Sequence, residues 1–147
     1  MRAELTRLLE DPEPAVRLRA LSVVGKLHAT AAGPLLVRRI QSPAMAALPL
    51  AERRLLLGTL AELSPRRAEA VALALLGDAH LLPSHALDDT RVVAAEVLGA
   101  VGGPEALAAL ARTAGRRWLN AAAVREAAAQ AAQAAATRLG LPLPGVS

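Results

Sequence analysis

The chain has 147 residues, of which 54% are hydrophobic and 20% are charged. A chain of this length can bury roughly two thirds of its unfolded surface, so one domain with its own core is expected and disorder is excluded. The net charge is only +4, and the absence of cysteine excludes disulfides, thiolate metal sites and cysteine nucleophiles.

The composition favours an all-α fold. Ala occurs 36 times and Leu 28 times, whereas Phe and Tyr are absent and Trp118 is the single tryptophan. Ala and Leu are strong helix formers, while strands draw on β-branched and aromatic residues. No apolar stretch approaches the roughly 18 residues of a membrane span, and the first residues lack the apolar segment of a signal peptide. We therefore expect a cytoplasmic protein.

Apolar residues recur at helical spacing nearly throughout the chain, interrupted by turn signals at short intervals. Asp11-Pro12-Glu13-Pro14 places a capping carboxylate and prolines where a helix begins, and Ser64-Pro65 repeats the pattern. Gly102-Gly103-Pro104 combines a glycine stop with a proline start. The spacing predicts eight helices, at 2–10, 13–27, 31–41, 50–63, 65–76, 88–101, 104–113 and 120–139.

The chain repeats itself. Arg17, Arg53, Arg91 and Arg125 recur at spacings of 36, 38 and 34 residues, each followed three and seven positions later by small or apolar residues. A helix pair repeated at this period is typical of an α-solenoid, in which stacking completes the core. We predict about four antiparallel helix pairs in a single domain, 1–140, with repeats at about 1–28, 29–63, 64–102 and 103–140 and an extended tail at 141–147.

Two of the repeats have a recognisable pattern. The segment from Leu8 through Asp11-Pro12 and Val16-Arg17 to Gly25 resembles the HEAT repeat family, especially the bacterial HEAT-like repeats of the PBS-lyase type. Arg91 through Gly99 is similar, whereas Ala61 and Gln133 replace that glycine in the other two copies. The resemblance covers residues 2–139 and implies a right-handed stack of helix pairs, but it implies little about the partner.

The four arginines have two interpretations. Arginines stacked at repeat spacing can bind phosphates or an acidic peptide. They can also act as a structural ladder, reaching carboxylates of their own or the adjacent turn and holding neighbouring repeats in register. We favour the ladder, with Asp11, Glu52 and Asp88 or Asp89 as candidate carboxylates. On this hypothesis Arg17→Ala lowers the melting temperature and leaves ligand binding unchanged.

A binding surface follows from helix geometry. In HEAT-like proteins the second helix of each pair lines the concave side, and residues four apart share a stripe. The expected stripes are Leu18, Ser22 and Lys26; Arg54, Gly58 and Glu62; Val92, Glu96 and Ala100; and Glu126, Gln130 and Ala134. This lining is mixed in charge and often small or apolar, which fits a protein or peptide partner better than a phosphate backbone.

The remaining motifs leave alternatives open. Arginine doublets, among them Arg66-Arg67 at a helix start, keep a nucleic-acid-associated module as an alternative, and a HEAT-like lyase is a third. The turns at 42–49, 77–87 and 114–119 are candidate specificity loops. His80, Ser84 and His85 in the second of these match no metal or hydrolase motif, so we expect no metal, cofactor or catalytic residue. We expect Trp118 to fold back over the last two helices.

Taken together, the sequence predicts a non-catalytic, monomeric protein-interaction scaffold. The predicted contacts are the concave face and the long turns, with Leu18, Ser22, Lys26, Arg54, Glu62, Val92 and Glu96 on the face. Arg66 and Arg67, at the start of a helix, are further contact candidates, because the helix dipole disfavours cations there. A fold-level resemblance specifies a shape and leaves the contact residues free to vary, so the identity of the partner stays open.

Overall fold

The computed structural model describes residues 2–78 and 84–145, and this part of the chain is all-α, without strands. The predicted fold class is confirmed in that respect. The α-helices are α1 (Arg2–Leu9), α2 (Pro14–Lys26), α3 (Gly33–Gln41), α4 (Leu50–Leu63), α5 (Pro65–Leu76), α6 (His85–Val101), α7 (Pro104–Gly115) and α8 (Ala122–Leu139). Two short 3-10 helices, η1 (Thr30–Ala32) and η2 (Pro43–Ala47), lie on either side of α3.

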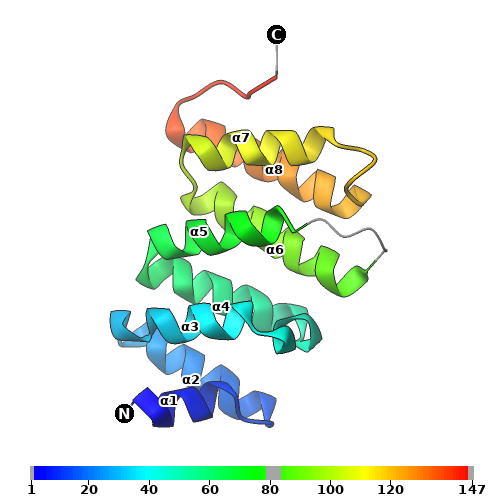
Figure 1. Ribbon diagram of the computed structural model, residues 1–147. Coiled ribbons are helices and arrows are strands. Elements are labelled where there is room, and N and C mark those ends of the chain that lie inside the picture. The colour runs from blue at the N-terminus through cyan, green and yellow to red at the C-terminus, as the bar shows by residue number, and fades with distance from the viewer. Residues whose placement is uncertain (1, 79–83, 146–147) are drawn as a thin grey trace.

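Each odd-numbered helix packs against the even-numbered helix that follows it, and the four pairs lie one above another with the chain ends at opposite ends of the stack (Figure 1). The even-numbered helices contact each other in the order α2, α4, α6, α8. On the other side, α3 contacts α5 and α5 contacts α7. Apolar residues between these two layers form one continuous core that includes the fully buried Leu36, Leu57, Leu60, Leu98 and Leu110.

Six of the eight described α-helices begin or end one to three residues away from the predicted positions, whereas α4 and α5 have the predicted bounds. α6 begins at His85 rather than 88 because the Ser84 hydroxyl accepts a hydrogen bond from the Leu87 N–H and caps the first turn. α8 begins at Ala122 rather than 120 because the Asn120 side chain is bonded elsewhere. The predicted turn at 42–49 contains η2. His80 and the rest of 79–83 lie outside the described residues.

The expectation for Trp118 is wrong. Its side chain is 99% exposed, so it covers no apolar surface of the last two helices. The neighbouring Asn120 is buried and donates hydrogen bonds to the backbone carbonyls of Thr113 and Arg116. These bonds hold the turn between α7 and α8 against the end of α7, and Trp118 projects from its outer side. An exposed indole is free to contact another molecule.

α6 and α8 approach closely because small residues meet between them. A Cβ atom added at Gly99 would lie 3.0 Å from the Ala131 Cα and 3.2 Å from the Ala131 backbone oxygen. Those atoms belong to the backbone of α8 and cannot move without shifting the helix. Gly58 in α4 differs, since a Cβ added there meets nothing within 4 Å.

These two glycines predict opposite effects of the same substitution. Gly99→Ala should lower the free energy of unfolding by about 1–3 kcal/mol, because the added methyl overpacks the contact of α6 with α8. Gly58→Ala should raise it by about 0.5–1 kcal/mol, because alanine favours the helix and fits without contact. Urea denaturation of both variants measures the difference. If both variants change the free energy of unfolding equally and in the same direction, α6 and α8 do not approach as closely as Gly99 and Ala131 indicate.

Candidate functional site

The even-numbered helices carry a row of three shallow hollows, which we call the second-helix groove. The hollows lie between α2 and α4, between α4 and α6, and between α6 and α8, with volumes of about 360, 450 and 320 Å³. Arg54, Gly58 and Glu62 line both the first and the second hollow, and Glu96 and Ala100 line both the second and the third. The three hollows are therefore parts of one surface that crosses all four helix pairs.

Small residues produce this groove. Gly25 and Gly58 line the hollow between α2 and α4, and Gly99, Ala100 and Ala134 line that between α6 and α8. Glycine and alanine leave the helix backbone close to solvent, so a partner can approach it. A shallow surface of this kind suits an extended contact better than the enclosure of a small molecule, which usually occupies a deep apolar cavity.

The groove carries both signs of charge. The Arg54 guanidinium donates to the Glu96 carboxylate at 2.9 Å and 3.0 Å, which links α4 to α6 across the second hollow. The hydrogen bond to Glu96 and the charge of that carboxylate raise the pKa of Arg54 above its ordinary value. Both side chains are nearly half exposed, so the pair contributes at most about 1 kcal/mol to stability. Lys26 and Glu62 add a further charge of each sign.

The structure brings five of the predicted contact residues to the lining of this groove, namely Ser22, Lys26, Arg54, Glu62 and Glu96. Leu18 and Val92 lie on the same helices but outside the lining of the hollows described. Arg66 and Arg67 lie apart from it at the start of α5, where the Arg67 side chain extends beside Gly33 of α3. Sequence periodicity placed the groove residues on one face and had no information on the doublet.

Arg17, the first ladder arginine, joins its own turn to the next helix pair. Its Nε and Nη2 donate to the two carboxylate oxygens of Glu52 in α4 at 2.7 and 2.9 Å, and Nη1 donates to the backbone carbonyls of Asp11 and Pro12. Arg17 and Glu52 are 8% and 3% exposed. The bond to Glu52 raises the pKa of Arg17 above its ordinary value, although burial acts in the opposite direction.

Arg53 repeats this arrangement in the next pair with neutral partners. Its Nε donates to the carbonyl of Leu48 in its own turn at 2.8 Å. Its Nη1 donates to the Ala86 carbonyl and to the Thr90 hydroxyl, both in the first two turns of α6. Glu52 and Thr90 each directly precede the arginine of their own pair, so the acceptor for one repeat lies beside the donor for the next.

Arg91 completes the series, and Arg125 ends it. Arg91 donates from Nε and Nη2 to the Leu76 carbonyl and from Nη2 to the Asn120 amide oxygen at 2.6 Å. Arg125 donates from Nε to the Asn120 carbonyl at 3.3 Å and lies in the last described pair. Among the expected carboxylates, Glu52 alone pairs with a ladder arginine in the described residues, and Asp11 contributes its backbone carbonyl. The hydrogen bonds of Arg53 and Arg91 within the described residues run to carbonyl, hydroxyl and amide oxygens rather than to the carboxylates of Asp88 or Asp89.

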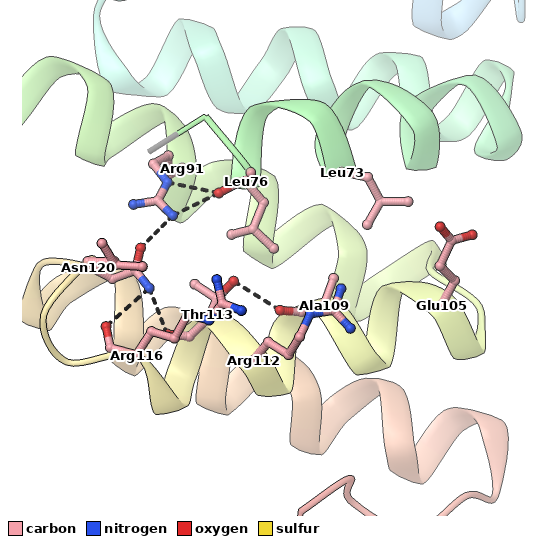
Figure 2. A pocket seen from close by; sticks show the side chains of 11 residues that line it. Leu73, Leu76, Arg91, Glu105, Ala109, Arg112, Thr113, Arg116 and Asn120 are labelled. Atoms are coloured by element: carbon pink, nitrogen blue, oxygen red, sulfur yellow. Dashed lines mark hydrogen bonds between the residues drawn. The ribbon is translucent and has the colours of Figure 1, made fainter. Parts of the chain in front are cut away.

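Two further cavities lie outside the groove. One, of about 350 Å³, lies between α5 and α7 and is lined by Arg91, Arg112, Arg116 and Asn120 among others (Figure 2). The other, of about 500 Å³, lies among α1, α2 and α3 and is almost wholly apolar. Sequence reasoning missed both, because each is formed by residues from three or more separate segments. The spacing of Arg112 and Arg116, four apart on one helix, was the one available signal.

Among residues 2–78 and 84–145, no three His, Cys, Asp or Glu side chains are grouped so that they could hold a metal ion. Within the same part of the chain, no helix has the length and hydropathy needed to cross a membrane. Comparison with protein-family models finds no family that matches the chain, and no curated protein is significantly similar to it.

The buried pair of Arg17 and Glu52 predicts a non-additive effect. Arg17→Met should lower the free energy of unfolding by about 3–5 kcal/mol, because Glu52 is left buried without its cation. The double variant Arg17→Met/Glu52→Met should recover most of this loss, since no charge is then buried unpaired. Chemical denaturation of the single and double variants gives the coupling energy.

Arg125→Met provides the matched control for this cycle. Arg125 donates one long hydrogen bond to the Asn120 carbonyl and is only partly buried. Removal of this bond should lower the free energy of unfolding by about 1 kcal/mol. If Arg17→Met lowers the free energy of unfolding no more than Arg125→Met does, the contact of Arg17 with Glu52 contributes as little to stability as an exposed ion pair.

Proposed function

We propose that this protein is a non-catalytic protein-interaction scaffold, built as a HEAT-like α-solenoid, that binds a protein partner along the second-helix groove. The observation that carries the proposal is the continuity of the groove across all four helix pairs. An extended partner segment can contact every repeat at once, and repeat proteins use extended surfaces of this kind for binding.

The stacking of helix pairs supports the solenoid. Contacts run between successive even-numbered helices and between successive odd-numbered helices from α3 onward, so each pair packs against its neighbours in the chain. The ladder arginines add polar contacts between adjacent pairs. A rigid stack is a suitable base for a binding surface, because the lining residues are held in place before the partner arrives.

The chemistry of the groove favours a protein over a nucleic acid. Lys26 and Arg54 are balanced by Glu62 and Glu96, and the Arg54 guanidinium is already paired with Glu96. A phosphate backbone requires a continuous row of unpaired cations. Small and apolar residues between the charges suit the mixed surface of a protein segment.

A substitution that fills the groove tests this proposal. Gly58→Trp places a large side chain in the groove at a position where an added Cβ meets nothing within 4 Å, so the fold should be retained while the groove is blocked. Ala70→Trp, on an exposed position of α5, is the control of equal bulk. We expect proteins captured by the immobilised wild-type chain from an extract of its source organism to be retained by Ala70→Trp and lost with Gly58→Trp. Quantitative mass spectrometry of the captured proteins measures this.

Equal capture by the two tryptophan variants would contradict binding along the groove. Recovery of this chain alone, together with a dimer in light scattering, would replace the scaffold by self-assembly. The thermal unfolding of each variant should match that of the wild type, which separates a blocked groove from a damaged fold.

A titration with nucleic acid separates the proposal from its alternative. We expect only weak association with fluorescein-labelled duplex and single-stranded DNA, with a shallow dependence on salt between about 50 and 200 mM. Fluorescence polarisation measures both. A tight complex whose affinity falls by about 1,000-fold over this range would instead assign the chain to the nucleic-acid-associated modules.

A further inference from the structure

The pocket between α5 and α7 (Figure 2) shares no lining residue with the second-helix groove. Three guanidinium groups line it, those of Arg91, Arg112 and Arg116. Among the described residues in the lining, Glu105 is the one acidic side chain, and it lies at the opposite end of the pocket from Arg91 (Figure 2). The lining therefore carries three positive charges and one negative charge.

Arg91 is a buried positive charge whose hydrogen-bond acceptors are neutral. The residue is 4% exposed, and its hydrogen bonds run to the Leu76 carbonyl and the Asn120 amide oxygen. Burial lowers the pKa of Arg91 more than the carboxylates of Asp88 and Asp78 raise it. Arg17 has the same place in its own repeat but carries a bonded carboxylate. Arg91 thus gives the pocket a positive potential that no contacting carboxylate cancels.

Arg112 and Arg116 supply exposed donors beside this buried charge. They lie four residues apart on α7, so their side chains share one face and repel each other. Neither guanidinium donates a hydrogen bond to, or forms an ion pair with, any other residue in the described part of the chain. The segment 79–83, which lies outside that part, contains neither Asp nor Glu. The guanidinium groups of Arg112 and Arg116 are therefore available to an anion of another molecule.

Apolar residues share this lining with the cations. They are Leu73, Leu76, Ala109 and Leu119. Next to Leu119, the Trp118 side chain is 99% exposed. A ligand that carries an acidic group directly beside an aliphatic one would match both parts of the lining. Protein segments provide that combination, whereas inorganic phosphate provides only the charge.

We propose that the α5–α7 pocket binds an acidic and aliphatic peptide segment of a partner protein, with a carboxylate between Arg112 and Arg116 and an aliphatic side chain against Leu119. The inference rests on the proposed function, since it names a class of partner for a protein-binding scaffold and adds a second contact site on the other helix layer. Paired guanidinium groups suit this role, because they donate charge-assisted hydrogen bonds to a carboxylate.

Trp118 provides the readout, because it is the one tryptophan of the chain and directly precedes Leu119, which lines the pocket. The probe is a blocked hexapeptide in which glutamate alternates with leucine, titrated into the full chain at low salt up to about 1 mM, a range that covers weak peptide complexes. We expect a saturable shift of the Trp118 emission to shorter wavelength. The same peptide with glutamine in place of glutamate should bind with an affinity lower by about tenfold or more, because the charge-assisted bonds are lost.

Two variants with the same loss of charge localise the binding. Arg112→Gln/Arg116→Gln should weaken the glutamate peptide about tenfold or more. Arg7→Gln/Arg19→Gln removes two exposed arginines from α1 and α2 and should change the affinity less than about twofold, since at that distance salt screens the charge. Equal effects of the two double variants, equal binding of the two peptides, or an unchanged emission would overturn the proposal. Tighter binding of single-stranded DNA than of the peptide, dependent on Arg112 and Arg116, would also overturn it.

Gly58→Trp separates this inference from the proposed function, with Trp118 observed through its indole N–H signal in the NMR spectrum. The variant should bind the glutamate peptide as the wild type does, because Gly58 does not line the α5–α7 pocket. If the peptide fails to bind while Gly58→Trp abolishes capture of partner proteins, the pocket inference alone is wrong. If the peptide binds and Gly58→Trp captures as the wild type does, the groove alone is wrong.

Discussion

A buried arginine near the start of a second helix is the interaction on which the arrangement of the pairs depends. The turn that enters each pair leaves backbone carbonyls without helical partners, and such groups must be hydrogen-bonded when they are buried. Arg17, Arg53 and Arg91 satisfy carbonyls of their own pair and reach a polar group of the next pair. A planar guanidinium with five donors can make both sets of bonds at once. One side chain therefore links a local turn to the stacking of the pairs.

The partner of this arginine changes along the stack, with consequences for the surface. Across the boundary to the next pair, Arg17 bonds a carboxylate, Arg53 bonds a hydroxyl and Arg91 bonds an amide. Among these three hydrogen-bonded contacts in the described residues, only that of Arg17 pairs the cation with an anion. In the last pair, the residue directly before the ladder arginine is Val124, whereas Glu52 and Thr90 hold that position in the earlier pairs. Valine has no oxygen in its side chain, and Asn120 accepts the hydrogen bond of Arg91 instead. Arg91, whose hydrogen-bond acceptors are neutral, then lines the same pocket as Arg112 and Arg116.

The two layers of helices thus offer different surfaces. The even-numbered helices present small residues and balanced charges along a continuous groove, which suits a long and shallow contact. The odd-numbered helices present a local cationic pocket lined in part by Leu119, the neighbour of the exposed Trp118. The same packed core supports both layers.

The sequence by itself determined the all-α class, the approximate extent of the helices, and which residues share a face of each second helix, because these follow from local spacing along one helix. The repeated arginines were likewise visible as a period. Only the tertiary structure decided that Asn120 rather than Asp88 or Asp89 meets Arg91, that Trp118 projects outward, and that Arg112 and Arg116 lie beside a buried charge. These features depend on how turns without any period pack between helices, and contacts of that kind leave no regular spacing in the chain.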